Sequence, residues 1–208
     1  MALSNLDELT KEIIAWSHRN DLGTRIPDFI TLAENAMYSN EEETLNIRSL
    51  ETITTDVTAS DLIDLPVDFE SARSIRLLTG DSGGTLQYQA PEQMRKEVST
   101  GRPLFFTIIG DQIQLDRVPD SGYTIEIQYF RKAAPLTTLT PTNEVLTNHP
   151  SVYLFGALTA LFAYTQDAEQ QIKYNTMFIS AIKGANAADK KGRYGPAPSL
   201  SLVNGMVV

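Results

Sequence analysis

The order of the periodic segments constrains this fold more than any single residue does: helical patterns stand at both ends of the chain, and β patterns fill its middle. Helices at the two ends can cover their apolar faces against each other, so the β region is predicted to be an insertion in a helical unit. The predicted fold is α+β, an α-helical bundle with an inserted antiparallel β-sandwich or small barrel and an extended C-terminal arm. The expected boundaries are 1–47 for an N-terminal helical hairpin, 48–132 for the β subdomain, 133–190 for C-terminal helices that pack on the hairpin, and 191–208 for the arm.

Both N-terminal helices are predicted from apolar stripes at steps of three and four residues. Pro27 suits the first turn of the second helix, because its fixed backbone angle is compatible with a helix start. The first stripe consists of Leu6, Leu9, Ile13 and Trp16, and the second of Phe29, Leu32, Ala33, Ala36 and Met37.

The middle of the chain contains short runs that are rich in β-branched residues or alternate apolar and polar side chains. Two turns, Gly110-Asp111 and Pro119-Asp120-Ser121-Gly122, have the chemistry that lets neighbouring strands pair as antiparallel hairpins. We therefore expect two hairpins to join the last three strands. The predicted strands are Leu50–Val57, Ser74–Leu78, Thr85–Gln89, Phe105–Ile109, Gln112–Leu115 and Tyr123–Phe130.

The C-terminal part begins with a polar passage, residues 133–148, after which Ser151 is the expected helix cap. Residues 152–164 are apolar nearly all round, which is typical of a helix that other helices or another subunit bury on most sides. A last helix is predicted over residues 168–189.

The change of composition after Lys190 predicts a docking arm over residues 191–208. Glycines and prolines there disfavour a continuing helix, yet eight apolar residues follow from Pro196 on, and no charged side chain follows Arg193. We predict that the arm adds as a strand to a partner protein or a neighbouring subunit; a tail folded back on its own subunit is the alternative. The predicted contact residues are Arg193 and Tyr194 at its root and Leu200, Leu202, Val203 and Met206 along it.

Charge and composition exclude several classes of function. A net charge of −9 argues against sequence-independent DNA binding, which relies on Lys and Arg to neutralise phosphates. Cysteine is absent, so thiolate chemistry is excluded and His18 and His149 are the only side-chain nitrogen ligands of the usual kind. No apolar run reaches the ~20 residues of a membrane helix and the first residues lack a secretory pattern, so residence in the cytoplasm is expected.

No group of residues forms a catalytic or metal-binding motif, and we predict neither an enzyme nor a cofactor. Neither histidine lies in a nucleophile motif, and the four aspartates between Asp56 and Asp68 lack the spacing of a calcium loop. Gly80–Gly84 lacks the Lys and Ser or Thr of a phosphate cradle and is interpreted as a hairpin loop.

For two groups of side chains, the sequence leaves two interpretations open. Glu41, Glu42 and Glu43 form a solvated linker or, at the wall of a channel, carboxylates that repel passing DNA. Four aromatic residues fill the core of the β subdomain or form a platform for sugar stacking, and the alternation of the strands favours the core. These residues are Tyr88, Tyr123, Tyr129 and Phe130.

Short tracts spread over nearly the whole chain follow one another in a recognisable order. They are Leu6–Trp16, Ile26–Glu34, Leu65–Glu70, Arg73–Ile75, Tyr129–Phe130, Ala134–Leu136, Thr142–Leu146 and Tyr153–Leu158. Each tract alone also encodes a common cap or strand start, but their order and spacing resemble the head-to-tail adaptor of short-tailed bacteriophages, of the tail tubular protein A type.

This resemblance implies a structural virion protein that forms a ring of about twelve copies in the neck of the particle. Such a ring sits under the portal protein, carries the tail nozzle protein and lets genomic DNA pass without specific binding; it has no active site and no contact with a membrane. The alternative is a soluble β-sandwich binding module, for example for carbohydrate, with helical flanks. Sizing separates the two, because a binding module stays a compact monomer whereas a connector enters a large ring when it meets its portal.

Overall fold

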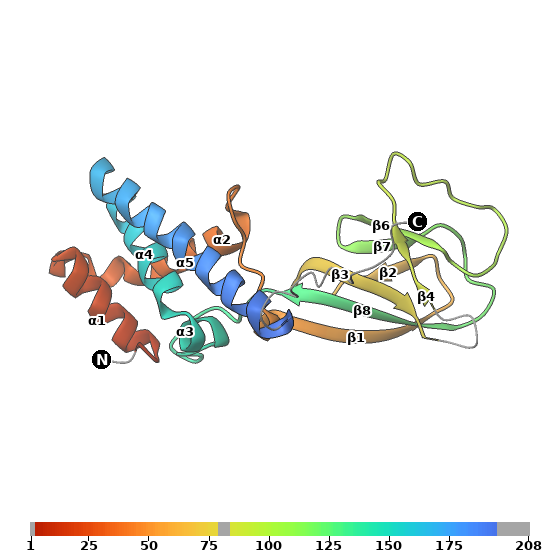
Figure 1. Ribbon diagram of the computed structural model, residues 1–208, viewed down its shortest axis with the longest axis horizontal. Coiled ribbons are helices and arrows are strands. Elements are labelled where there is room, and N and C mark those ends of the chain that lie inside the picture. The colour runs from red at the N-terminus through yellow and green to blue at the C-terminus, as the bar shows by residue number, and fades with distance from the viewer. Residues whose placement is uncertain (1–2, 79–83, 195–208) are drawn as a thin grey trace, which may run out of the picture. The chain divides into compact units, whose positions relative to one another are not determined.

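The structure, a computed structural model, describes residues 3–78 and 84–194 of the 208-residue chain. It divides into two compact units (Figure 1). One unit is helical and contains the two ends of the described chain, up to Ile47 and from Ala134 on; the other, Arg48–Ala133, contains the strands. The predicted α+β fold is confirmed, since the described residues form five α-helices and two four-stranded sheets.

Helix α4 lies at the centre of the helical unit, as its apolar composition predicts. It contacts α1, α2, α3 and α5. Its consecutive residues Val152, Tyr153 and Leu154 are all buried, which requires cover on more than one side because neighbouring helical residues are about 100° apart. The elements of the unit are α1 (Leu6–Ser17), the 3₁₀ helix η1 (Asn20–Arg25), α2 (Ile26–Ser39), α3 (Glu144–Asn148), α4 (Pro150–Tyr164) and α5 (Ala168–Tyr194).

Three helices approach one another closely at Gly156 of α4. A Cβ atom added there would lie 2.9 Å from Cβ of Ala33 in α2 and 3.0 Å from Cε2 of Phe178 in α5. Ordinary contacts between carbon atoms are about 3.5–4.0 Å long. The packing of α2, α4 and α5 therefore depends on the missing side chain of this glycine.

The start of α4 differs from its predicted cap. Ser151 is not the cap, because the helix begins at Pro150 and His149 precedes it. Proline at the first helical position has no N–H that needs a cap, so the serine is not required. The polar passage before it contains α3, a helix that was not predicted from the sequence; the Asn143 side chain caps it by accepting a hydrogen bond from Leu146 N–H (2.9 Å).

Helix α5 extends beyond its predicted end. The sequence predicts an end at residue 189, whereas the helix ends at Tyr194, so residues 191–194 are helical and the predicted start of the extended arm is wrong. Glycine inside a helix lowers its stability by only about 1 kcal/mol relative to alanine. Gly192 therefore does not end α5. Arg193 thus lies in the last turn of α5. The other predicted contact residues of the arm, Leu200, Leu202, Val203 and Met206, lie outside the described residues.

The β unit contains two sheets with the strand orders β1-β8-β3-β4 and β2-β7-β6-β5. Every pair is antiparallel except β5 with β6. Alternate residues, such as Ile125, Ile127 and Tyr129 of β8, point into one hydrophobic cluster to which both sheets contribute. Among the described residues neither sheet closes on itself, so the small barrel is not found. The elements are η2 (Arg48–Leu50), β1 (Glu51–Thr58), β2 (Leu62–Asp64), β3 (Phe69–Leu77), β4 (Gly84–Thr85), β5 (Gln87–Tyr88), β6 (Phe105–Ile109), β7 (Gln112–Leu115) and β8 (Tyr123–Arg131).

One of the two predicted hairpins exists and the other does not. β6 and β7 form an antiparallel pair around a turn in which Gly110 has φ +59°, a conformation that favours glycine. The predicted hairpin of β7 with β8 is wrong, because these strands belong to different sheets. Buried Asp116 ends β7 by accepting hydrogen bonds from Leu104 N–H (2.9 Å) and Phe105 N–H (3.2 Å) at the start of β6. The turn after it therefore leads the chain from one sheet to the other.

Candidate functional site

An aromatic cluster crosses the surface of the helical unit where α1, α4 and α5 meet. The Trp16 ring lies 5.9 Å from the Phe155 ring and 6.4 Å from the Tyr174 ring, and Tyr174 stacks on Phe162 at 5.2 Å. Trp16 is nonetheless 42% exposed, although the sequence places it on the buried stripe of its helix. Exposed Trp beside other aromatic side chains is typical of a protein–protein contact site.

A groove of about 390 Å³ continues this cluster along α4 and α5. Phe155 belongs to both the cluster and the groove. The remaining lining is small or flexible: Ser151, Thr176, Met177, Ser180 and Ala181. None of these side chains carries a charge, so the groove suits an uncharged helix or loop of a partner. We call the four aromatic residues and this groove together the helical surface.

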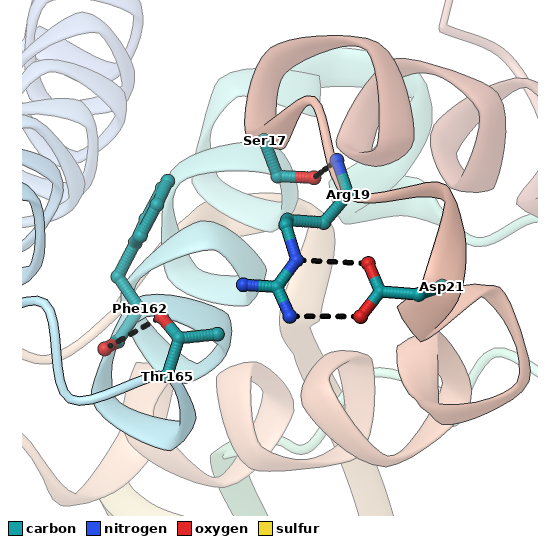
Figure 2. Close-up of polar contacts among 5 residues, drawn as sticks. All are labelled: Ser17, Arg19, Asp21, Phe162 and Thr165. Atoms are coloured by element: carbon teal, nitrogen blue, oxygen red, sulfur yellow. Dashed lines mark hydrogen bonds and ion pairs between the residues drawn. The ribbon is translucent and has the colours of Figure 1, made fainter.

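A polar turn borders the aromatic cluster (Figure 2). Arg19 donates from Nε and Nη2 to the two carboxylate oxygens of Asp21, at 2.8 Å each, and its backbone N–H lies 3.4 Å from Ser17 Oγ. The hydrogen bonds from Arg19 lower the pKa of Asp21. In the same view, Thr165 Oγ1 donates to the carbonyl of Phe162 (3.3 Å) at the end of α4. Because both charged groups are exposed, their pair orients the turn and adds little stability.

A second concavity lies in the β unit, beside strand β3. Its volume is about 570 Å³. One wall is the whole run Phe69–Ile75, and the opposite wall comes from the segment around β5 and from β6, including Tyr88, Phe106 and Ile108. We call this concavity the β3 groove.

A buried polar network ties α2 to α4 and to the segment before α3. Glu34 Oε1 accepts hydrogen bonds from Leu136 N–H (2.8 Å) and Tyr153 Oη (3.1 Å), and the Asn143 amide donates to Tyr153 Oη (2.7 Å). Burial raises the pKa of Glu34, and burial with the nearby Glu34 carboxylate raises the pKa of the Tyr153 phenol. The same amide donates to Ala134 O (2.7 Å), so the network holds chain segments together.

Two of the three carboxylates considered for a channel wall contact α5. Asn186 Nδ2 donates to Glu43 Oε1 (2.6 Å), and Lys183 Nζ lies 3.8 Å from Glu42 Oε2. Glu41 and Glu42 are exposed, whereas Glu43 is half-buried. The segment is therefore attached to the helical unit at Glu43 and presents its two other carboxylates to solvent.

The four aspartates of the strand region are not brought together. Asp61 pairs with Lys96, Asp64 accepts from Gln112 Nε2 (2.7 Å), and Asp68 accepts from Tyr129 Oη (2.9 Å). Asp56 accepts from Val57 N–H (2.8 Å), as a residue in a turn or strand does. In residues 3–78 and 84–194, no three His, Asp or Glu side chains lie together so that they could hold a metal ion.

The two histidines both lie at helix ends. His18 ends α1 with φ 52° and is exposed. His149 lies between α3 and α4, where its backbone N–H donates to Val145 O (2.7 Å) and burial lowers its pKa. They come from different elements, and neither position resembles a nucleophile turn.

The four aromatic residues of the strand region form no common platform. Tyr129 is buried and Tyr123 packs partly against the core, so the core interpretation is confirmed for these two. It is wrong for Tyr88, which is 61% exposed and lies edge-on to Phe106 at 5.7 Å. Tyr88 belongs to one sheet, and Tyr123, Tyr129 and Phe130 belong to the other.

Comparison with known proteins identifies one family. The sequence pattern described as SU10 adaptor protein matches residues 4–199, nearly the whole chain, and confirms the resemblance drawn from the short tracts. No curated protein matches the chain. None of the helices in the described part of the chain is long and apolar enough to span a membrane.

Proposed function

The chain belongs to the SU10 adaptor protein family, and from this premise we propose that it is a structural protein of the bacteriophage neck, where it forms a ring that joins the portal to the tail. The match over residues 4–199 is the observation that carries this proposal. The ring contains about twelve copies, encloses a channel through which DNA passes and carries the tail nozzle protein on its far side. It assembles in the cytoplasm of the host and performs no catalytic step.

The helical surface supports the ring. In a ring each subunit uses two different patches, one for each neighbour, and both need uncharged, well-packed centres. Trp16 and the groove beside Phe155 have this composition. We therefore assign the helical surface to a contact with a neighbouring subunit or the portal.

The charge of the chain supports the channel. A net charge of −9 repeated about twelve times is on the order of −100, and such a field keeps phosphates from adhering to the wall. Glu41 and Glu42, which are exposed, are our candidates for this wall, with Glu43 anchoring their segment through Asn186. A neck structure whose inner surface consists mainly of Lys and Arg would contradict this assignment.

The C-terminal arm supplies the attachment to a partner. Beyond Arg193 the chain carries no charged side chain, so its apolar residues need cover. Leu200, Leu202, Val203 and Met206 are proposed to enter pockets of a portal or neighbouring subunit, and Arg193 and Tyr194 to anchor the root. Deleting residues 195–208 is expected to leave the fold intact and to prevent incorporation into portal complexes.

One pair of variants tests the proposal through the helical surface. Ser180→Arg places a large cation in the groove on α5, whereas Gln171→Arg adds the same side chain at an exposed position of the same helix outside the groove. With purified portal protein, size-exclusion chromatography with light scattering should show a large complex for wild type and Gln171→Arg and its loss for Ser180→Arg. Wild-type protein that stays a compact monomer with portal would instead favour the binding module.

A second variant tests the absence of catalysis. Replacing His18 and His149 together by Gln should leave particle assembly and infectivity close to normal, because neither imidazole is assigned a chemical role. Intact particles that have lost infectivity would contradict a purely structural protein.

A further inference from the structure

Strand β3 has a long edge along which none of the described strands pairs. Its outer side pairs with β4 only at Arg76 and Leu77, and Leu86 N–H donates to Ile75 O (2.8 Å) just before them. In the described residues, no strand pairs with Phe69–Ser74 on the side away from β8. Open strand edges of this kind are templates for an added strand.

The β3 groove lies along this edge. Seven consecutive residues of β3, Phe69–Ile75, line it. Because successive side chains of a strand point to opposite faces, a consecutive run means that the edge of the strand borders the groove. The opposite wall offers the side chains of Leu86, Phe106 and Ile108. Backbone groups on one side and apolar side chains on the other are what a bound strand needs.

The groove suits a strand without charged side chains. Of the two charged residues in its lining, Glu70 pairs with Lys132 at 3.3 Å and Arg73 pairs with Glu51 at 2.6 Å. A charged occupant would lose its hydration and find no unpaired charge among these partners. An uncharged segment with apolar side chains at alternate positions loses little hydration free energy on binding and covers the apolar wall.

The C-terminal arm of this chain has that composition. None of the fourteen residues after Tyr194 has a charged side chain. Within them, Pro198-Ser199-Leu200-Ser201-Leu202 alternates apolar and polar residues, which is the period of a strand with one covered face. Fully extended, fourteen residues span about 46 Å, enough to leave one subunit and reach another.

We propose that the β3 groove of each subunit binds residues 198–203 from the arm of a neighbouring subunit as an added strand, with Leu200 and Leu202 facing the apolar wall. This proposal rests on the ring of the proposed function. An arm on one part of the chain and a groove on another form a contact between two different patches, and repetition of such a contact closes a ring. An arm bound to its own groove would fill both patches and connect no subunits.

Disulfide trapping between two preparations tests the proposal directly, because the chain has no cysteine of its own. One preparation carries Ala72→Cys or Ser74→Cys in the groove, and the other carries Leu202→Cys in the arm. They are mixed, assembled with purified portal protein, oxidised and separated on a non-reducing gel. We expect a covalent dimer from the mixture. Two controls are matched: Ala59→Cys replaces an exposed alanine of the same unit outside the groove, and Ser201→Cys replaces a residue that the proposed pairing turns away from the apolar wall. Each control should form much less covalent dimer than the groove and arm variants.

A double variant, Ala72→Cys with Leu202→Cys in one chain, distinguishes the source of the arm. A crosslink within the monomer, together with no dimer from the mixture, would show that the arm binds its own subunit and would overturn the proposal. A dimer formed equally by the two controls would show random collision and would also overturn it. Absence of any crosslink in complexes that do contain portal and adaptor would refute the groove as the acceptor while the proposed function stands. If wild-type chain and portal form no complex at all, the proposed function fails instead, and the same mixture without portal still decides whether the groove binds the arm.

Discussion

Gly156→Ala should destabilise the helical unit, although alanine is the better helix former. The added Cβ would lie 2.9 Å from Cβ of Ala33, which is attached directly to the backbone of α2 and cannot rotate away. To restore a contact of at least about 3.5 Å, α2 and α4 must separate by about 0.6 Å. Phe178, whose Cε2 would lie 3.0 Å from the added Cβ, is only 2% exposed and so is surrounded by other side chains.

The size of the effect follows from two opposing contributions. Replacing glycine by alanine inside a helix stabilises it by about 1 kcal/mol. Overpacking of a filled core costs about 1–3 kcal/mol, and the rigid Ala33 contact places this site near the upper end. The expected net loss is therefore about 1–2 kcal/mol, or a fall in melting temperature of roughly 2–8 °C for a chain of this size.

The assay is urea unfolding followed by the fluorescence of Trp16, the single tryptophan, which lies in the helical unit. Gly184→Ala is the matched control: it lies in α5, a Cβ there would meet no atom within 4 Å, and the variant should gain about 0.5–1 kcal/mol. Adding Ala33→Gly to Gly156→Ala removes the clashing methyl group and should restore part of the loss. If Gly156→Ala is as stable as Gly184→Ala, the close approach of α2, α4 and α5 at Gly156 is contradicted.

Three further variants test polar contacts. Asn186→Ala removes the amide that accepts from Asn46 N–H (2.9 Å) and donates to Glu43 and to Thr44 O. Measured by urea unfolding, the variant should lose about 2–3 kcal/mol of unfolding free energy. The control Asn35→Ala, at an exposed position, should stay within about 0.5 kcal/mol of wild type. Glu34→Gln tests the raised pKa: a carboxyl group whose pKa is higher in the folded than in the unfolded state loses stabilisation as pH rises from its ordinary value of 4.5 through the raised pKa. The urea midpoint of Glu34→Gln should therefore rise relative to that of wild type as pH rises from about 4 to about 7. A constant difference between the two midpoints over this range would contradict the assignment. Asp116→Ala leaves two backbone N–H groups without their acceptor, so amide hydrogen exchange should accelerate at the start of β6, and unchanged exchange there would show that the carboxylate does not hold this strand.

Strong periodicity made the long elements predictable. β6 and β7 have the predicted bounds, and β8 extends one residue further, to Arg131. The runs of β7 and β8 alternate apolar and polar residues, and Gly110-Asp111 marks the turn between β6 and β7. Strand pairing was harder: Pro119–Gly122 has the chemistry of a hairpin turn, but such a turn serves equally for a chain that changes sheets. Short elements such as β2 and α3 were missed, since three to five residues hold no period and depend on contacts distant in sequence.

The interaction surfaces depend on arrangement in space, which one sequence does not specify. Trp16 is identifiable from sequence, but its exposure depends on how α1 crosses α4 and α5. The β3 groove was likewise hidden, because its lining combines residues of four strands and its open edge follows from the strand order. Apart from the family resemblance, the composition of the arm after Arg193 was the signal of a partner in the sequence.

Residues that periodicity predicts to be buried and that one subunit leaves exposed indicate where other chains bind. Single exposed apolar residues are common and need no explanation. Trp16 is different, because it lies on the apolar stripe predicted for its helix and is 42% exposed. When an apolar stripe is wider than the area that its own subunit covers, the remaining apolar surface stays in contact with water. This exposure costs about 25 cal/mol for each Å². In the proposed ring the neighbouring subunits would remove that cost, so the exposed part of the stripe and the uncharged arm both favour a protein whose apolar surface is completed by its neighbours.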